Sequence, residues 1–243
     1  MHTLVLVHPF PLSAAVYEAD REALRDRMRV LTPNMRGFDG EAPWNEGEVP
    51  TIDAMADDVA AHLDREGVRD RVVLGGHSMG GYVTLAFARR HPERLRGIVL
   101  ADTRAEPDTE EQKKAREANI ARAEEGDVGG LVDGLVDKLV GPDLAVRALV
   151  RSVALRQPPG ALVGALRALR DRPDAHPGLS AIAVPALVLV GQDDAITPPS
   201  AAEMMHERIP SSKLVVIPHA RHLSNLDQPE AFREAVASFV LAL

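Results

Sequence analysis

The chain has 243 residues, of which 45% are apolar and 26% are charged, an ordinary composition for a globular protein. Its 28 Lys and Arg residues are outnumbered by 36 Asp and Glu residues, which gives a net charge of -8. No stretch concentrates basic side chains, so we expect no nucleic-acid partner. The chain contains no cysteine, which excludes disulfides, thiolate-zinc sites and cysteine nucleophiles.

No part of the sequence is apolar over a length that could cross a membrane. The first apolar run, Leu4–Val7, lacks a basic flank, and the longest, Ala181–Val190, contains Pro185. A helix that spans a bilayer needs about 20 apolar residues. We therefore expect a soluble cytoplasmic protein with no membrane partner.

Short apolar runs rich in β-branched residues recur along the chain, and each leads into turn-forming or helix-capping residues. Helical patterns lie between them, such as 78–90, which ends before Pro92, and 232–243. Strands that alternate with helices indicate crossover connections and a parallel sheet. The six predicted strands are Leu4–Val7, Arg29–Leu31, Val72–Leu74, Ile98–Ala101, Ala186–Val190 and Leu214–Ile217.

This alternation stops between Thr103 and Ser180, where the pattern is helical throughout. Glycines and prolines divide the segment into four predicted short helices. We interpret 1–102 and 181–243 as an α/β core, and 103–180 as a helical cap over the sheet edge where open α/β sheets bind ligands. The alternative is a further packing layer without a functional role. The leucines predicted to roof the site are Leu131, Leu135, Leu139, Leu149, Leu162 and Leu166.

The segment Gly76–Gly80, with the sequence Gly-His-Ser-Met-Gly, lies between a predicted strand and a predicted helix. A serine at such a sharp turn is held in a strained conformation, and residues two positions away approach too closely to carry a Cβ atom. Ser78 is then presented at a helix N-terminus, whose dipole favours a developing oxyanion. The pattern predicts a nucleophilic Ser78. In the alternative interpretation, Ser78 only caps the helix and the glycines only form the turn.

A nucleophilic serine needs an imidazole base, and the base needs a carboxylate that fixes its tautomer. The fifth predicted strand is followed by Asp193 and Asp194, and the sixth is followed by His219 and His222. Because the carboxyl ends of parallel strands meet at one edge of the sheet, these side chains can reach the serine. The residues alone leave two candidates for the acid and two for the base.

Five segments outside the insertion, residues 4–13, 36–40, 76–81, 191–199 and 217–230, carry recognisable motifs. With them the chain resembles the α/β-hydrolase superfamily, in particular the small esterases and lactonases typified by 3-oxoadipate enol-lactonase. The chain order of serine, acid and histidine also agrees with this arrangement. The resemblance places the family's acid on Asp194, with Gly191 three residues before it, and the catalytic histidine on His222. It thereby favours Asp194 over Asp193 and His222 over His219.

The same resemblance places the oxyanion turn on His8 and Pro9, and it assigns the oxyanion hole to the backbone N–H groups of Phe10 and Met79. Pro9 stands where the family has glycine. This substitution removes one N–H group but leaves that of Phe10 free, so we expect the oxyanion hole to survive.

Two further departures from the family concern the histidine loop and the start of the chain. His219 and Arg221 stand where glycines are usual. The chain begins at the strand before the oxyanion turn, so the antiparallel first strand pair of the family's sheet is missing. We therefore predict an α/β-hydrolase fold with six parallel strands, in the spatial order second, first, third, fourth, fifth, sixth.

These features predict a serine hydrolase that cleaves a small carboxylic ester or lactone through an acyl-enzyme intermediate. An enol-lactone would carry a carboxylate and need a cation, for which Arg36 and Arg104 are candidates, although either could instead tie loops together. Leu135 and Leu139 of the cap are predicted to contact the substrate. The alternative from another class is a ligand sensor of the same fold that turns over slowly.

The remaining histidines fall into two groups. His8 and His77 adjoin the site in sequence and are predicted to hydrogen-bond the turns that shape the oxyanion hole. His62, His91 and His176 are predicted to be solvated or to cap helices. No spacing of His, Asp and Glu matches a metal-binding motif, so we expect neither a metal nor a cofactor. The sequence does not indicate an oligomeric state.

Overall fold

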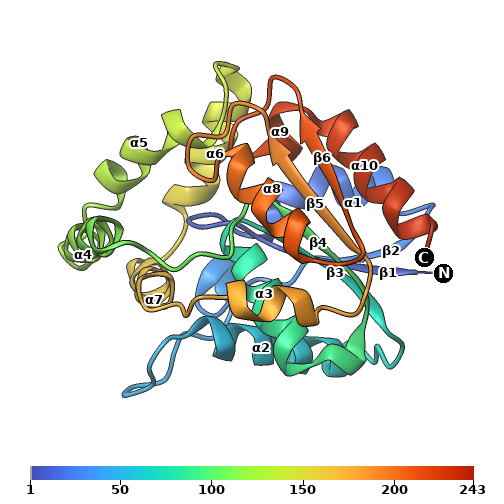
Figure 1. The fold of residues 1–243 in the computed structure, drawn as a ribbon. Helices are drawn as coiled ribbons and strands as arrows, with labels where there is room; N and C mark the ends of the chain where they lie inside the picture. Colours follow the sequence, from blue (N-terminus) through green and yellow to red (C-terminus); the bar gives the residue numbers. More distant parts are fainter. Residues whose placement is uncertain (1) are drawn as a thin grey trace.

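One sheet of six parallel strands forms the centre of the structure, a computed structural model that describes residues 2–243 (Figure 1). The strands are ordered β2-β1-β3-β4-β5-β6, and within the described residues no antiparallel pair precedes β1. The predicted fold class and strand order are therefore confirmed. The strands are β1 (Thr3–Val7), β2 (Arg29–Leu31), β3 (Val72–His77), β4 (Leu95–Ala101), β5 (Ala186–Gly191) and β6 (Ser212–Ile217).

Burial explains which strands are central. Every residue of β3 and β5 is buried, because helices cover both faces of a parallel sheet. The edge strands β2 and β6 are only partly buried. Their short or mixed patterns are typical of sheet edges.

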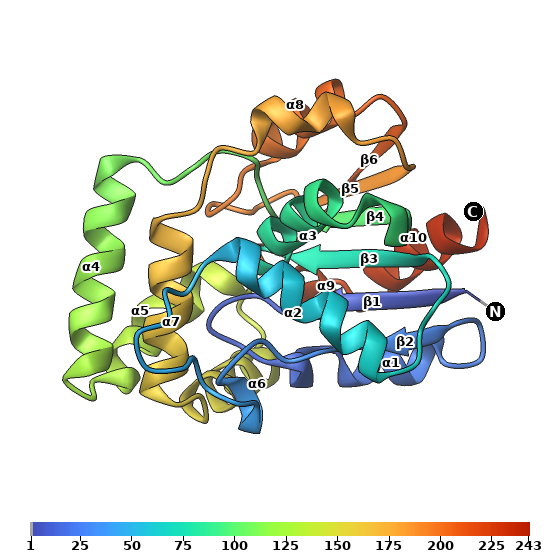
Figure 2. The ribbon, with the colours of Figure 1, turned by 90° about the horizontal axis from the view of Figure 1, so that it is seen from below.

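Two layers of helices cover the sheet. Helices α1 and α10 lie on one face, and α2, α3 and α8 lie on the other (Figures 1 and 2). None of the described helices combines the length and the apolar character needed to cross a bilayer. The core α-helices are α1 (Glu18–Leu24), α2 (Ile52–Arg65), α3 (Met79–Arg90), α8 (Pro199–Arg208), α9 (Ser224–Asp227) and α10 (Pro229–Leu241). Short 3-10 helices are η1 (Ala14–Tyr17), η2 (Phe38–Gly40), η3 (Pro92–Arg94) and η4 (His176–Ala181).

Four helices follow β4, in the segment where four were predicted. They lie beyond the carboxyl ends of the strands, with α4 packed against α7 and α5 against α6 (Figure 2). This position places them over the edge of the sheet that carries Ser78. The helices are α4 (Glu110–Glu124), α5 (Val128–Leu139), α6 (Leu144–Leu155) and α7 (Pro159–Arg170).

The end of α5 is tied to the loop that carries His222. The Leu223 N–H donates to the Leu139 carbonyl at 2.8 Å, and the Gly141 N–H donates to an Asp227 carboxylate oxygen at 2.9 Å. The Arg221 guanidinium donates to two further carbonyls at the same helix end. These bonds fix one cap helix directly beside the histidine loop.

Two details of the insertion differ from the sequence interpretation. Leu149 is 44% exposed, and the buried side of α6 is formed by Val150, Val153 and Ala154, so the prediction that Leu149 roofs the site is wrong. The last part of the segment, including η4, lies beside α3 and α8, away from the four cap helices. The chain must return to the amino end of the sheet here, because β5 runs parallel to β4.

Candidate active site

Ser78 lies at the sharp turn between β3 and α3, with φ 53° and ψ -109°. Positive φ is strained for a residue with a side chain and persists only where the surroundings hold it. Here the Ser78 N–H donates to the Ala101 carbonyl, and the Thr103 hydroxyl donates to the Ser78 carbonyl, both at 2.9 Å. The turn is thereby anchored to the end of β4.

The turn requires glycine at positions 76 and 80, because a Cβ atom at either position would clash with the backbone. A Cβ atom on Gly76 would lie 1.9 Å from the Gly80 carbonyl oxygen. One on Gly80 would lie 2.1 Å from the carbonyl oxygen of Val7, on β1. The sequence pattern therefore reflects a steric requirement of the turn.

His222 links Ser78 to Asp194. Its Nε2 lies 2.8 Å from Ser78 Oγ, and its Nδ1 lies 2.8 Å from Asp194 Oδ2. A carboxylate can only accept, so Nδ1–H donates to Asp194, and Nε2 is left to accept the serine hydroxyl proton. This is the tautomer that a general base for Ser78 requires.

Asp194 is buried, and both of its oxygens are held. Oδ1 accepts the N–H groups of Ile196 at 2.8 Å and Thr197 at 3.0 Å, while Oδ2 accepts the Thr197 hydroxyl at 2.6 Å in addition to His222. Burial opposes ionisation, but His222 and the hydrogen bonds outweigh it and hold the pKa of Asp194 below its ordinary value. Thr197 was not singled out from the sequence, although a threonine three residues after an aspartate is a recognisable turn signal.

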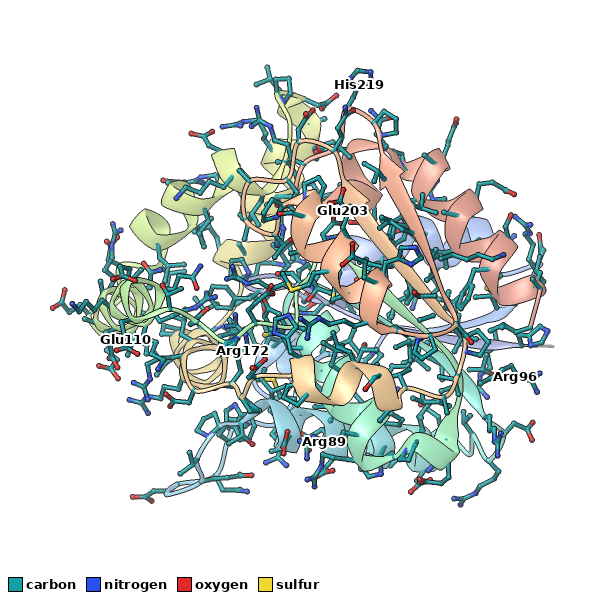
Figure 3. All side chains as sticks on the ribbon, in the orientation of Figure 1. Arg89, Arg96, Glu110, Arg172, Glu203 and His219 are labelled. Atoms are coloured by element: carbon teal, nitrogen blue, oxygen red, sulfur yellow. The ribbon has the colours of Figure 1, made fainter. Side chains whose placement is uncertain are left out.

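The alternative candidates lie elsewhere. Asp193 and His219 are both exposed, and Figure 3 shows His219 at the outer surface, on the loop that follows β6. His219 has φ 58°, so it occupies a position where the family's glycine would be unstrained. The structure brings Ser78, Asp194 and His222 together and leaves Asp193 and His219 outside the cluster.

Of the two predicted oxyanion donors, Met79 follows Ser78 directly, and Phe10 lies three residues beyond the end of β1, the strand that pairs with β3. Met79 is the first residue of α3, where N–H groups have no partner within the helix, and the Phe10 N–H donates to no backbone group in residues 2–243. His8 supports this turn: its Nδ1–H donates to the Pro9 carbonyl at 3.1 Å, and its Nε2 accepts the Met35 N–H at 3.0 Å. Burial lowers the pKa of His8 to about 4, so the ring is neutral.

Asp102, at the end of β4, connects the loops of all three residues. It has φ 44° and is fully buried. Its carboxylate accepts the Gly191 N–H at 2.7 Å and the Ser224 hydroxyl, and it lies 3.1 Å from Nε2 of His77. These contacts lie on the chain segments that carry Asp194, His222 and Ser78. Burial, and then the negative charge of Asp194, raise the pKa of Asp102 well above its ordinary value.

His77 completes this buried layer. Its Nε2 lies 2.5 Å from the His222 carbonyl oxygen, to which it donates. Burial, and then the nearby His222, lower the pKa of His77 to about 3, so the ring is neutral. We expected His77 to support a turn near the oxyanion hole, whereas its partner is the backbone of the histidine loop. Asp102 and Ser224 were missed, because their role depends on contacts between distant parts of the chain.

Arg36 is saturated by other contacts. Its guanidinium donates to both oxygens of Asp58 at 2.6 and 2.7 Å and to Glu48 at 2.6 Å. It also lies over the Trp44 ring, 4.7 Å from the centroid. These contacts favour the structural alternative for Arg36, which ties the loop before α2 to that helix.

Arg104 and the two predicted cap leucines have different surroundings. Arg104 lines a cavity beside α3 that Ser78 does not line. Leu139 is buried, and its carbonyl binds the residue after His222, whereas Leu135 is only partly buried against the core. Of these three, Leu139 is the residue that the contacts place beside the histidine loop.

Comparison with known proteins agrees with this architecture. The model of the Alpha/beta hydrolase family matches residues 4–235, so the chain belongs to that family. A thermophilic esterase from Thermogutta terrifontis, solved with malate bound, superposes with a TM-score of 0.94 at 38% identity, covering 100% of this chain and 90% of that one. The prediction of an α/β-hydrolase of the esterase and lactonase branch is confirmed.

Two curated relatives extend the comparison. The chain is 32% identical to the pimeloyl-[acyl-carrier protein] methyl ester esterase of Neisseria meningitidis, over 97% of this chain and 75% of the relative. It is 29% identical to 3-oxoadipate enol-lactonase 1 of Acinetobacter baylyi, over 91% of this chain and 82% of the relative. The relatives thus include both an esterase and a lactonase.

Proposed function

We propose that the protein is a serine hydrolase that cleaves a small carboxylic ester through an acyl-enzyme intermediate. Ser78 is the nucleophile, His222 the general base and Asp194 the carboxylate that orients it. The observation that carries this proposal is the unbroken hydrogen-bond chain from Asp194 through His222 to Ser78, with both links at 2.8 Å. The esterases among the relatives support the same reaction class.

The reaction proceeds in two halves. Ser78 Oγ attacks the ester carbonyl carbon while its proton moves to His222 Nε2. The resulting oxyanion accepts hydrogen bonds from the N–H groups of Met79 and Phe10. The carbon–alkoxide bond then breaks, and the alkoxide leaves with the proton from His222. Water repeats the sequence on the acyl-enzyme: His222 accepts its proton, the acid is released, and Ser78 regains its hydrogen.

A carboxylate-bearing lactone is the second candidate substrate, since one relative is an enol-lactonase. Such a substrate needs a cation near Ser78. Arg36 is saturated by Asp58 and Glu48, and Arg104 faces the cavity beside α3. These contacts favour a neutral ester over the lactone.

Steady-state hydrolysis of short-chain nitrophenyl esters tests the proposal and separates it from a sensor that turns over slowly. Many turnovers per minute, abolished in Ser78→Ala, are expected, because a triad that lacks its nucleophile loses roughly a million-fold in turnover. A single burst followed by no turnover would support the sensor. Hydrolysis that survives Ser78→Ala would overturn the assignment. A five-membered lactone with a carboxylate side chain, assayed in parallel, decides between the two substrate classes.

A further inference from the structure

A cavity of about 630 Å³ lies along one face of α3, and Ser78 is not among the residues that line it. Tyr82, Leu85 and Arg89 of α3 line one side, and the returning segment that includes η4 lines the other. Ligand pockets in proteins commonly have volumes of about 300–1,000 Å³. We call it the α3 cavity; Arg172 and Arg89, which contribute to its walls, are labelled in Figure 3.

The lining of the α3 cavity is largely apolar. On α3 its lining extends from Tyr82 to Arg89, which spans roughly 10 Å at the helical rise of about 1.5 Å per residue. Between these ends the walls carry Leu85, Ala86 and Ala88 on one side and Leu179 and Ile182 on the other. A cavity of this form fits an extended aliphatic chain.

Most charged groups on its walls are already satisfied by neighbouring protein groups. Arg89 donates to both oxygens of Asp53 at 2.6 Å. Arg172 lies over the Tyr82 ring and donates to Asp108 at 2.6 Å and to two backbone carbonyls at 2.9 Å. A ligand that bound either arginine would have to replace these charge-assisted hydrogen bonds, so neither is the preferred contact for a ligand.

Arg104 differs from the other two arginines. Its side chain is 15% exposed, and its Nε is buried without a hydrogen-bond partner in the described part of the chain. Asp108 lies 3.6 Å from its guanidinium but is already bound by Arg172 at 2.6 Å and by Arg116 at 3.0 Å. Three guanidinium groups thus share one carboxylate, and Arg104 is the most distant of them.

We propose that the α3 cavity binds an aliphatic monocarboxylate, with its carboxylate on Arg104 and its chain along the outer face of α3. A guanidinium binds a carboxylate through two parallel hydrogen bonds, and Asp108 stays paired when Arg104 turns to the ligand. Because Ser78 does not line the cavity, this inference stands whether or not the proposed catalysis is correct.

Calorimetric titration of hexanoate, octanoate and decanoate into Ser78→Ala tests the proposal. Each added methylene should tighten binding about fourfold, from the free energy of burying a CH2 group. Adding Arg104→Gln to this background should weaken octanoate binding by about tenfold or more, because a charge-assisted pair is lost. Adding Ala88→Trp, which fills the cavity from its partly exposed rim, should abolish binding.

Two controls identify the site. Arg96→Gln removes an exposed arginine that does not line the cavity and should leave the affinity unchanged. Octanol has the same chain without the charge and should bind at least tenfold more weakly than octanoate. The proposal is overturned if no carboxylate binds at millimolar concentration, or if binding is unaltered by Arg104→Gln and Ala88→Trp, which would place the ligand elsewhere.

Discussion

Ser78, Asp194 and His222 are each positioned by a different local feature. Ser78 depends on two glycines that could not carry a Cβ atom, and Asp194 depends on a turn in which Thr197 binds both of its oxygens. His222 is oriented by Asp194 at Nδ1. The geometry therefore supports these residues as the proposed acid and base over their neighbours in sequence.

Paired substitutions test that assignment. His222→Ala and Asp194→Asn should each reduce turnover by orders of magnitude, roughly 10⁴-fold where a triad carboxylate is neutralised. His219→Ala and Asp193→Asn should have little effect, because both side chains are exposed. Steady-state kcat for the four variants provides the measurement. An inverted ranking within either pair would show that the wrong residue has been assigned.

His8 predicts a pH dependence of stability. Its pKa is about 4 in the folded chain against 6.5 as the ordinary value, so between these pH values the unfolded chain binds a proton that the folded chain does not. The free energy of unfolding should fall as the pH is lowered through this window, by at most about 3 kcal/mol from His8.

Urea denaturation at pH 7 and pH 4.5 measures this effect. His8→Gln keeps an acceptor for the Met35 N–H and does not titrate, so its loss of stability between the two pH values should be smaller. Equal losses in the two proteins would contradict the neutral, buried state of His8.

At the scale of elements, the carboxyl ends of β3, β4 and β5 and the loop after β6 meet at Asp102. Asp102→Ala leaves the Gly191 N–H and the Ser224 hydroxyl without their buried acceptor, and each unsatisfied group costs about 1–3 kcal/mol. We expect a large loss of stability and of kcat. Ser224→Ala removes only one of these partners and should cost about 1 kcal/mol. If the two variants had the same denaturation profile, this would contradict the role of Asp102 in connecting these loops.

The sequence predicted the strands and their order better than the contacts between the loops that follow them. Strands such as β3 and β5 are buried throughout, so their apolar runs are distinctive, and turn residues mark where they end. The Ser78 turn was predictable because its requirement is local and steric. The roles of Thr197, Asp102 and Ser224 depend on which loops meet, and Leu149 was misplaced because an amphipathic pattern does not say which neighbour a helix packs against.

At the scale of the whole molecule, we propose that the four helices after β4 and the core together select the substrate. Helix α5 is bonded to the histidine loop through Leu139 and Leu223, so it is held close to the reacting atoms. Its buried face is aliphatic, including Leu131 and Val136. We therefore expect a preference for small acyl groups over polymers.

Acyl-chain length should therefore control specificity. From acetyl to longer nitrophenyl esters, kcat/KM should rise up to about fourfold per methylene, since each buried CH2 group contributes about 0.8 kcal/mol, and then fall sharply once the chain meets the cap. Leu139→Ala should move the maximum to longer chains. A flat profile from acetyl to decanoyl would show that the cap does not contact the substrate.

The central claim is that Ser78 forms a covalent acyl intermediate. Its most direct test is mass spectrometry of the protein quenched in acid during turnover of a nitrophenyl butyrate, followed by peptide mapping. We expect one butyryl group per chain, on the peptide that contains Ser78, and none in Ser78→Ala. Rapid turnover with no adduct under conditions that trap acyl-enzymes, or an adduct on another residue, would contradict it.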